Sequence, residues 1–422
     1  MSVSKHTLAN GLKVIFVPKP DTQAVTTLVL VEAGSKYEDK RNNGISHFLE
    51  HMCFKGTTRR PKASDISMEL DSLGAKYNAF TAQEYTGYYA KVQSKHFAQA
   101  FDLIADMYLH PLFDAKEIDK ERGVIIEEIN MYEDNPARGV QDYIMEVLYG
   151  NQPAGWTITG SKAAVKRFKR RDFIKYRAAH YLPQTTTVVI AGRFNQREAI
   201  ALIKKTFGGM PAGTALPKKA VVEKQSKPVV AIKYKQSDQA HLVIAFRSRP
   251  MSHKDTYALD VLSSVLGGGM SSRLTQKIRD ELGAAYYVWA CDDSYTDHGL
   301  FEVSVGADTK RAPDIVKTIL TECRRLKRET VSAAELRRVK DHILGNLYLD
   351  LESSNNVANF YGMQQVLKHK IEPPLAYAKK IEAVTARQLK RLAGEIFVAN
   401  NLNCALIGPF TNKRDFERVL NI

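Results

Sequence analysis

Two kinds of hydrophobic pattern alternate along the chain. Short runs dominated by apolar and β-branched residues predict buried strands, because a strand covered on both faces needs apolar side chains on both. Stretches of 15 or more residues that repeat their apolar positions every three or four residues predict amphipathic helices. The clearest strand runs are LKVIFVP (12–18), TTLVLVEA (26–33), TTTVVIAGRF (185–194) and HLVIAFRS (241–248). The alternation predicts a mixed, α+β fold.

The two halves of the chain contain the same elements in the same order. Each half runs from a helix into a Leu-Gly-Ala triplet, at 73–75 and at 282–284, and then into strand segments. A long amphipathic stretch follows in each half, at 114–129 and at 332–347. Because several elements recur about half a chain apart, we expect a duplicated unit that forms two homologous α/β-sandwich domains.

The stretch GGMPAGTALPKKAVVEKQSKP (208–228) lies at mid-chain and is rich in Gly, Pro and Lys. Such composition is typical of an exposed interdomain linker. We therefore predict an N-terminal domain at 1–212, a linker at 213–228 and a C-terminal domain at 229–422. The chain of 422 residues is long enough for two domains with a core each.

Composition limits the class of protein. The chain is 44% hydrophobic and 25% charged, which excludes a disordered or collagen-like polymer. Its net charge of +15, with basic runs such as KRFKRRDF (166–173), raises the alternative of a nucleic-acid binder. That run is more typical of a solvated helix face, and no recognised nucleic-acid motif accompanies it. We expect no nucleic-acid partner.

Compartment signals point to the cytoplasm. The four cysteines are far apart and form no CxxC pair, which argues against a disulfide framework or a thiolate zinc site. The first 20 residues lack the apolar core of a signal peptide and the Arg-rich character of a transit peptide. No run of about 20 apolar residues could span a bilayer. We predict a cytoplasmic protein without a membrane partner; a presequence removed before maturation is the open alternative.

The segment GISHFLEHMCFKGT (44–57) carries the candidate chemistry. Its periodicity predicts a helix that ends at Gly56. On a helix, His47 and His51 lie one turn apart on one face, and Glu50 projects to the same side. Two imidazoles so placed can hold one Zn²⁺ with a carboxylate beside the bound water, whereas a surface helix with two solvated histidines is the alternative.

A third zinc ligand must come from elsewhere, and ERGVIIEEINMY (121–132) offers three glutamates. One helical stripe of this segment is apolar and is predicted to face the core; it comprises Ile118, Ile125, Ile129 and Tyr132. Glu121 and Glu128 lie on the adjoining stripe, whereas Glu127 lies on the solvent side. Glu128 is therefore the better ligand candidate. Glu121, two turns earlier, is a candidate to support a ligand, with an ordinary ion pair to a nearby base as its alternative.

These residues resemble a known family. HFLEHMCFKGT, followed 77 residues after His51 by Glu128 in ERGVIIEEI, is similar to the inverted-zincin metallopeptidases: the insulinase, pitrilysin and mitochondrial processing peptidase family. The likeness covers nearly the whole chain, and the length resembles the half-length, processing-peptidase-like bacterial members. Further matching stretches are NGLKVIFVP, YNAFTAQEYTGYY, INMYEDNP and LGGGMSSRLTQKIRDELGAAYYV.

The resemblance implies a role for each matching residue. The zinc ligands would be His47, His51 and Glu128, with one Zn²⁺ per chain, because the second half has no HxxEH. Glu50 would be the base that activates water, and Glu121 the supporting carboxylate. Arg279 and Tyr286 match the pair that faces the substrate carbonyl. The edge strand that pairs with an extended substrate would comprise Asn78, Ala79, Phe80 and Thr81. Cys53 departs from the aliphatic residue of many relatives, and we expect it to face the core.

The resemblance also implies an activity and an assembly. The expected function is a zinc-dependent endopeptidase that hydrolyses extended peptides or unfolded polypeptides inside a dimer chamber, with each chain forming half of a clamshell. Because each chain carries both half-sites, we expect a homodimer; a heterodimer with an inactive homologue is the alternative. A second alternative is a non-catalytic scaffold subunit of the same fold, although such subunits usually lose part of the ligand set.

Overall fold

The computed structural model describes residues 2–422 and divides into two compact units. Each unit contains one mixed β-sheet with helices on both faces, so each has the layers of an α/β sandwich. Unit 1 comprises residues 1–129, 156–219 and 348–373; unit 2 comprises residues 130–155, 220–347 and 374–422. The predicted class, two homologous α/β domains, is confirmed.

Unit 1 is built on a six-stranded sheet in the order β1-β2-β6-β3-β5-β4. Along β3, Val25, Val29 and Val31 enter one core, whereas the alternate residues Leu28 and Leu30 point to the other face. Both faces are therefore apolar, as the strand runs predicted. The strands are β1 Ser4–Thr7, β2 Lys13–Pro18, β3 Ala24–Val31, β4 Lys76–Thr81, β5 Thr86–Gln93 and β6 Thr186–Gly192.

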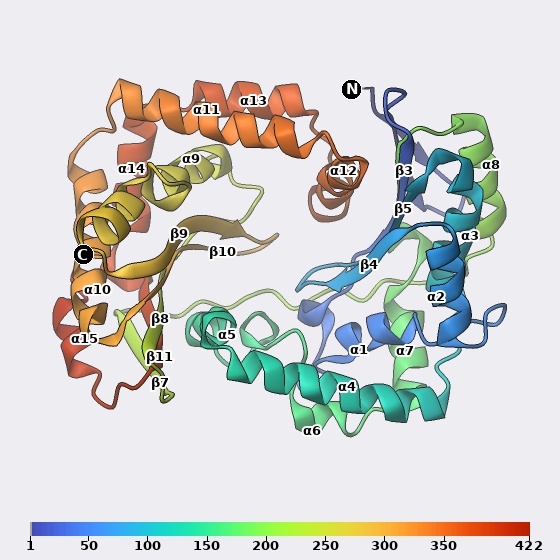
Figure 1. The fold of residues 1–422 in the computed structure, drawn as a ribbon, viewed down its shortest axis with the longest axis horizontal. Coiled ribbons are helices and arrows are strands. Elements are labelled where there is room, and N and C mark those ends of the chain that lie inside the picture. The colour runs from blue at the N-terminus through green and yellow to red at the C-terminus, as the bar shows by residue number, and fades with distance from the viewer. Residues whose placement is uncertain (1) are drawn as a thin grey trace. The chain divides into compact units, whose positions relative to one another are not determined.

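Helices cover both faces of this sheet. On the second face α12 packs against β3 and β6 (Figure 1). A Cβ on Gly362 of α12 would lie 2.6 Å from Leu30 Cδ1, so the helix needs glycine there to approach the sheet closely. The helices of unit 1 are α1 Ile45–Met52, α2 Ala63–Ser72, α3 Phe97–Leu109, α6 Lys162–Val165, α7 Arg170–His180, α8 Gln196–Phe207 and α12 Ser354–Lys368, with short 3₁₀ turns at Ser35–Tyr37, Ser94–His96 and Pro183–Thr185.

Unit 2 repeats this plan with a five-stranded sheet in the order β7-β11-β8-β10-β9. Each sheet contains one parallel pair of strands: β2 pairs with β6 in unit 1, and β7 pairs with β11 in unit 2. The remaining neighbours are antiparallel, and unit 1 adds β1 outside β2. The strands are β7 Val229–Tyr234, β8 Gln239–Arg247, β9 Ala285–Ser294, β10 Gly299–Asp308 and β11 Leu402–Gly408.

Helices also cover both faces of the second sheet. The larger core lies beneath α9, α10 and α14, and the smaller one beneath α5, where Val140 and Ile144 meet Val243 and Ala405. The helices of unit 2 are α5 Pro136–Tyr149, α9 Thr256–Gly267, the π-helix Thr275–Glu281, α10 Ala312–Arg328, α13 Pro374–Ala383, α14 Ala386–Ile396 and α15 Arg414–Val419, with short 3₁₀ turns at Pro153–Gly155, Thr309–Arg311 and Ala399–Asn401.

The two Leu-Gly-Ala triplets occupy equivalent places. Gly74 and Gly283 have φ values of +60° and +58°, a left-handed conformation that favours glycine. Each follows a helix and leads into the edge strand of its sheet, β4 in unit 1 and β9 in unit 2. The duplication predicted from the sequence is therefore present in the fold.

Two long helices carry the chain between the units. The chain leaves unit 1 within α4, Ala115–Asp134, and α5 then joins the sheet of unit 2. It leaves unit 2 within α11, Ala333–Asp350, and α12 then joins the sheet of unit 1. Each half of the sequence thus supplies one helix to the other half's sheet. The division at 1–212, 213–228 and 229–422 stays a prediction about the duplicated sequence.

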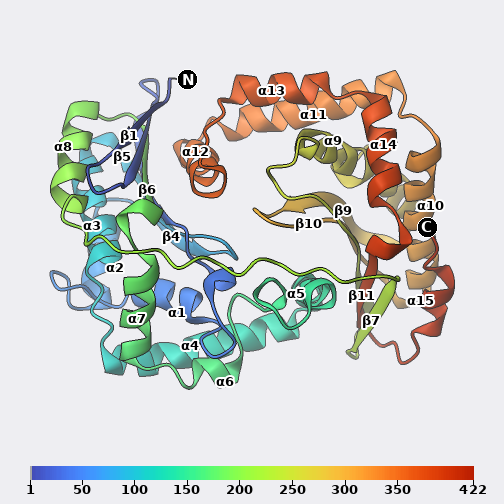
Figure 2. The same ribbon diagram turned by 180° about the vertical axis from the view of Figure 1, so that it is seen from behind.

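The mid-chain segment has no regular structure between Met210 and Lys227 (Figure 2). It is tied down nevertheless: Lys218 Nζ forms an ion pair with the buried Glu84 in unit 1, and Val222 N donates to Gln152 Oε1 in unit 2. Among residues 2–422, no helix is long and apolar enough to cross a membrane.

Candidate metal centre

The helix that carries the HxxEH residues is fixed at its start by Glu38. This buried carboxylate accepts hydrogen bonds from the backbone N–H groups of Gly44 and Ser46, both at 2.8 Å, and from Asn43 Nδ2 at 2.9 Å. A carboxylate at this end of a helix satisfies unpaired N–H groups and complements the helix dipole. Burial raises the pKa of Glu38 to about 7, and these donors oppose the rise.

The same helix ends earlier than predicted. α1 stops at Met52 rather than at Gly56, and tight turns follow. Gly56 has φ +122°, and a Cβ there would lie 2.5 Å from Pro61 O, so this glycine serves a close backbone approach and not the helix end. Because the loop folds back at once onto the rest of unit 1, the helix is cut short by tertiary contacts that periodicity does not encode.

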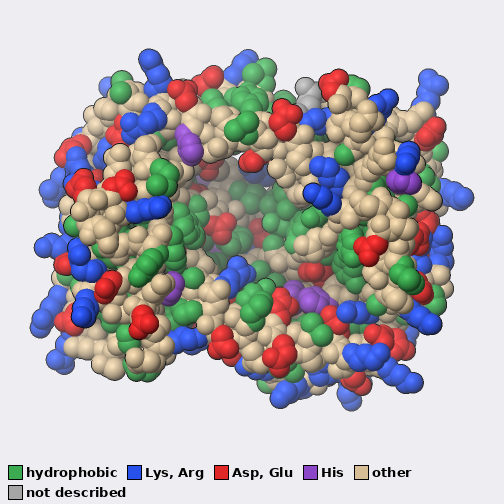
Figure 3. Space-filling view, in the orientation of Figure 1, with side chains coloured by type: hydrophobic (Ala, Val, Ile, Leu, Met, Phe, Trp, Pro, Cys, Tyr) green, Lys and Arg blue, Asp and Glu red, His purple; other side chains and the backbone are tan. Residues whose placement is uncertain are grey.

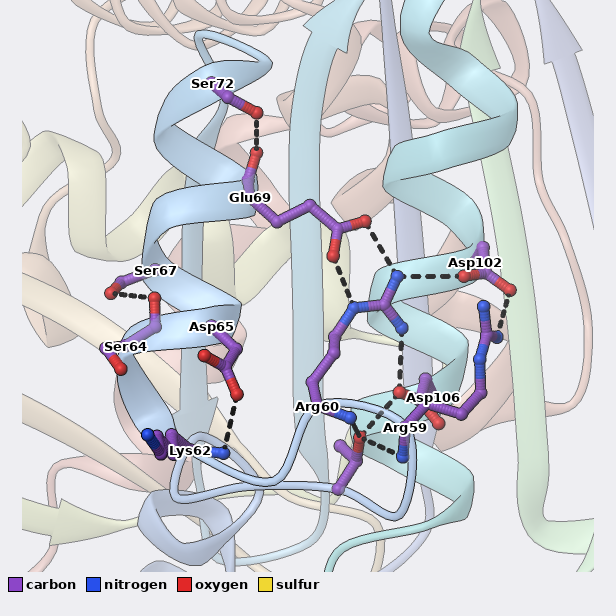
Figure 4. Close-up of polar contacts among 11 residues, drawn as sticks. Arg59, Arg60, Lys62, Ser64, Asp65, Ser67, Glu69, Ser72, Asp102 and Asp106 are labelled. Carbon is purple, nitrogen blue, oxygen red and sulfur yellow. Dashed lines mark hydrogen bonds and ion pairs between the residues drawn. The ribbon is translucent and has the colours of Figure 1, made fainter.

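A buried guanidinium holds the loop that follows α1 (Figure 4). Arg60 contacts Glu69 at 2.5 and 2.7 Å, Asp102 at 3.0 Å and Asp106 at 2.8 Å. Thr57 Oγ1 donates to the same Asp106 oxygen at 2.6 Å. These contacts tie the loop to α2 and α3, and thereby fix where the chain leaves α1.

Three side chains converge beside α1. His47 Nε2 and His51 Nε2 lie 3.3 Å apart, and Glu128 Oε2 lies 3.5 and 3.6 Å from them. Among residues 2–422 these three form a group of His, Cys, Asp or Glu whose ligand atoms all lie within 4.8 Å of one another. The structure therefore brings together the three residues predicted as metal ligands.

The spacing of these atoms fits zinc. Zn²⁺ binds imidazole nitrogen and carboxylate oxygen at about 2.0–2.2 Å with tetrahedral angles, which places neighbouring ligand atoms about 3.3–3.6 Å apart. The three observed separations of 3.3, 3.5 and 3.6 Å lie in that range. Two nitrogens and one carboxylate oxygen leave a fourth tetrahedral position for water, the arrangement of a catalytic zinc.

The phase of α4 decides which glutamate reaches the site. Of the stripe predicted as core, Ile118, Ile125 and Ile129 are buried in unit 1, whereas Tyr132 is only partly buried. Glu127 is exposed, whereas Glu128 faces the two histidines with a side chain that is 20% exposed. The choice of Glu128 over Glu127 from helical phase agrees with this placement.

Glu121 contacts His51. Its Oε1 lies 2.8 Å from His51 Nδ1, so the carboxylate accepts that N–H and leaves Nε2 to face the cluster. Lys55 Nζ lies 2.6 Å from the other oxygen, Oε2. Although burial raises the pKa of Glu121, the hydrogen bonds from His51 and Lys55 lower it below its usual value.

The two histidines differ in their surroundings. Burial, together with the neighbouring His51, lowers the pKa of His47 to about 4, which keeps this imidazole neutral and able to bind a metal. Burial also lowers the pKa of His51, but the hydrogen bond that His51 donates to Glu121 and the nearby carboxylates raise it overall. Within residues 2–422, His47 Nδ1 has no hydrogen-bond partner, and the polar contacts of that ring are made by Nε2.

Glu50 lies beside the cluster on the same helix. Its side chain is largely buried, and burial raises the pKa of its carboxyl group. Thr81 Oγ1 donates a hydrogen bond to Glu50 Oε2 at 2.6 Å, which partly opposes that rise. A carboxylate whose pKa is raised is a stronger proton acceptor, which is the property that a general base needs.

Thr81 ends β4, the strand predicted to pair with substrate. β4 is the last strand of its sheet, and among the described residues its ladder partner is β5. Asn78 is exposed, Ala79 is buried, and Phe80 packs edge-on against Tyr85 at a ring-centroid distance of 6.0 Å. The segment 78–81 therefore forms a sheet edge that leads directly to Glu50.

Arg279 and Tyr286 belong to unit 2. Arg279 lies near the end of the π-helix, is exposed, and donates to Met270 Sδ at 3.5 Å. Tyr286 is in β9 and its side chain is 65% exposed. π-helical turns often occur at functional sites, and no sequence pattern predicted this one. The part that these two residues play toward a substrate stays a prediction.

The basic excess is not gathered into one visible patch. Lys and Arg side chains are scattered over the face shown in Figure 3. Within the run 166–173 the cations are exposed, whereas Phe168 and Phe173 are buried against Phe48 of α1. Cys53 is fully buried, as expected.

Comparison with known proteins identifies the family. A family model described as Insulinase (Peptidase family M16) matches residues 13–162, and one described as Peptidase M16 inactive domain matches residues 167–343. The chain belongs to the insulinase-like peptidase family M16. All residues of the metal cluster lie within the first match.

Relatives of this M16 chain share its full length. It is 34% identical over 414 residues to YmxG, an uncharacterized zinc protease of Bacillus subtilis, with 97% of this chain and 99% of the relative covered. It is 31% identical to an uncharacterized zinc protease of Mycobacterium leprae, with 100% of this chain and 95% of the relative covered. The crystal structure of a protease from Helicobacter pylori superposes with a TM-score of 0.90 at 25% identity. The match covers 97% of this chain and 99% of that protease.

Two residues of the site were not anticipated from the sequence. Glu38 caps α1, and Lys55 pairs with Glu121. The signal for Lys55 was available, because it stands four residues after His51 and therefore one further turn along. Glu38 gave no comparable signal, since its link to Gly44 and Ser46 depends on how the intervening loop folds.

Proposed function

We propose that this chain is a zinc-dependent endopeptidase that hydrolyses extended peptides or unfolded polypeptides. The observation that carries the proposal is the convergence of His47 Nε2, His51 Nε2 and Glu128 Oε2 at tetrahedral spacing, with Glu50 beside them. We propose one Zn²⁺ per chain at this cluster. When bound, zinc would polarise the scissile carbonyl and make a bound water acidic enough to react near neutral pH.

Glu50 is the proposed proton carrier. One oxygen, Oε2, accepts the hydrogen bond from Thr81, which orients the carboxylate and leaves Oε1 for water. Glu50 takes a proton as water attacks the carbonyl and passes it to the departing amine nitrogen. Burial raises the pKa of Glu50, which makes its carboxylate a stronger proton acceptor for the first step.

Arg279 and Tyr286 are the proposed partners of the substrate carbonyl oxygen. A tyrosine hydroxyl and a guanidinium can donate hydrogen bonds to the negative charge that develops there, and one such donor typically contributes about 10²–10³ in rate. The exposure of both side chains supports the proposal, because neither is committed to the core of unit 2.

The substrate strand is proposed to add to the edge of β4. Backbone pairing along Asn78, Ala79, Phe80 and Thr81 recognises an extended main chain and not a particular sequence. The edge position of β4 and the Thr81–Glu50 hydrogen bond support this, because a peptide paired there would run past the proton carrier. Folded proteins, which do not offer a free strand, would be poor substrates.

The proposed assembly is a homodimer with an enclosed chamber in the cytoplasm. Each chain holds the metal cluster and the Arg279–Tyr286 pair, so two identical chains suffice for two complete sites. A heterodimer with an inactive homologue is the competing assembly. Light scattering on the purified protein separates a monomer from a dimer, and mass spectrometry identifies a second kind of chain.

Metal content and peptide cleavage test the function together. Purified protein should contain about one zinc per chain and cleave a fluorogenic peptide library, and 1,10-phenanthroline should abolish cleavage. Glu128→Gln should lose zinc, whereas the matched change Glu127→Gln, on the exposed side of the same helix, should keep it. Glu50→Gln should keep zinc and lose cleavage.

The competing function is a non-catalytic scaffold of the same fold. Wild-type protein that binds zinc but cleaves none of the library, with the same result for freshly reconstituted protein, would favour the scaffold. Cleavage at full rate by Glu50→Gln would contradict the proposed mechanism.

A further inference from the structure

Lys55 makes a short contact with the carboxylate that supports a metal ligand. Its Nζ lies 2.6 Å from Glu121 Oε2, while Glu121 Oε1 lies 2.8 Å from His51 Nδ1. The three side chains form a continuous line of contacts that ends at His51 Nε2, in the metal cluster. The Lys55 side chain is 26% exposed, and that of Glu121 only 6%.

Glu121 needs this ammonium to stay in place. A buried carboxylate with a single neutral hydrogen-bond donor is poorly compensated for the water it has lost, and breaking a buried ion pair is strongly unfavourable for the partner left behind. Without Lys55, the Glu121 carboxylate would recover hydration free energy by turning toward water. Such a turn would remove the hydrogen bond that orients the His51 ring.

The surrounding loop places Lys55 for this contact. Lys55 N bonds to Met52 O in the turns that end α1, and the next residue, Gly56, accepts a hydrogen bond from Leu112 N. Beyond it, the buried guanidinium of Arg60 binds three carboxylates and anchors the loop (Figure 4). The side chain of Lys55 therefore starts from a fixed backbone position.

Charge supports the same role. Zn²⁺ and the Lys55 ammonium together balance the three carboxylates of Glu50, Glu121 and Glu128. Without Lys55 the partly buried site would hold one uncompensated negative charge when loaded, which is costly in a medium of low dielectric constant.

We propose that Lys55 is a positioning residue that holds Glu121 in contact with His51 and so strengthens metal binding. Lys55 is not one of the three residues of the metal cluster. The proposal rests on the proposed zinc site, and it adds a residue that is needed for zinc retention although it is not a ligand.

The test is the zinc dissociation constant of purified apoprotein, measured by competition with a chromogenic chelator. Lys55→Met should weaken zinc binding about 10- to 100-fold, the usual effect of losing a group behind a metal ligand. Lys120→Met is the matched control: it removes the same charge from the residue next to Glu121, but its side chain is 71% exposed and pairs with Glu117. The control should bind zinc like the wild type.

A double-mutant cycle shows whether Lys55 acts through Glu121. If it does, Lys55→Met should have no further effect in a Glu121→Gln background. Additive effects of the two changes, or unchanged or tighter zinc binding by Lys55→Met, would overturn the proposal. Circular dichroism of each apoprotein establishes that the variants are folded.

If Lys55→Met does not fold, two further variants test the positioning role of Lys55. Lys55→Arg keeps a cation that reaches Glu121 and should bind zinc within about threefold of the wild type, whereas the neutral, shorter Lys55→Gln should bind more weakly. Equal binding by all three proteins would contradict the positioning role. Wild-type protein that takes up no zinc would instead contradict the proposed function, whatever the variants do.

Discussion

Thr81 Oγ1 donates a hydrogen bond to Glu50 Oε2 at 2.6 Å, and this contact joins the end of an edge strand to the proposed proton carrier. The strand on which we expect a substrate to align therefore also orients the carboxylate that acts on it. A shift of β4 would move both at once.

Thr81→Val tests this link because valine keeps the shape of the side chain and removes the hydroxyl. With one donor fewer, Glu50 loses its fixed orientation, and we expect kcat to fall about tenfold or more. Zinc content should not change, since Thr81 is not a ligand. Thr81→Ser keeps the hydroxyl and should stay near wild-type rate; an equal loss in both variants would indicate a packing effect instead.

Arg60 offers a prediction about stability. Arg60→Met would leave Glu69, Asp102 and Asp106 without their shared cation, and we expect a loss of about 3–5 kcal/mol in the free energy of unfolding. Urea unfolding measures the loss. Arg59→Met, whose side chain is 58% exposed and contacts Asp102 alone among these carboxylates, should cost less than about 1 kcal/mol. Equal losses would show that burial of the ion pairs is unimportant.

The proposed dimer predicts rescue between two inactive chains. If the metal cluster of one chain works with Arg279 and Tyr286 of the other, a mixture of Glu50→Gln and Tyr286→Phe chains forms some dimers with one intact site. Equal mixing and random exchange would restore about one quarter of wild-type activity. Cleavage assays after denaturing and refolding the mixture measure it. No rescue, although both variants form mixed dimers, would place the whole site in one chain.

Asp292 predicts a pH dependence of stability in unit 2. Burial raises its pKa to about 7, against hydrogen bonds from Ser248 and Ser294 that lower it. The folded state then holds this proton more tightly than the unfolded chain, so the stabilisation is fully present below about pH 4 and is lost as pH rises to about 7. Between pH 5 and pH 7.5 the loss should be about 2–3 kcal/mol.

Asp292→Asn should remove the part of the pH dependence of the free energy of unfolding that Asp292 contributes. Urea midpoints measured at both pH values for the two proteins provide the comparison. A slope that is unchanged in the variant would assign the pH dependence to other groups, such as the buried Glu302.

The sequence predicted those parts of the fold that local pattern controls. The alternation of strands and helices, together with the Leu-Gly-Ala triplets at Gly74 and Gly283, was enough to predict two homologous sandwich domains. The triplets can be recognised in the sequence because a backbone position with positive φ favours glycine. Pattern could not predict that α5 and α12 join the opposite sheets. An amphipathic helix shows that it has an apolar face, but not which sheet will cover it.

The same limit applies to the site. Helical spacing was sufficient to group His47, Glu50 and His51 and to prefer Glu128, since each depends on position within one helix. Glu38 and Lys55 act across a loop and between helices, so their roles follow from tertiary contacts. Arg279 and Tyr286 rest on the family resemblance, and the complementation experiment is their test.

The reciprocal placement of α5 and α12 has a consequence for how the chain folds. Each half, synthesised alone, would leave one face of its sheet bare and would carry a helix with no surface to bind. Neither half can therefore mature independently, and a cut in the mid-chain segment should yield fragments that refold only when mixed.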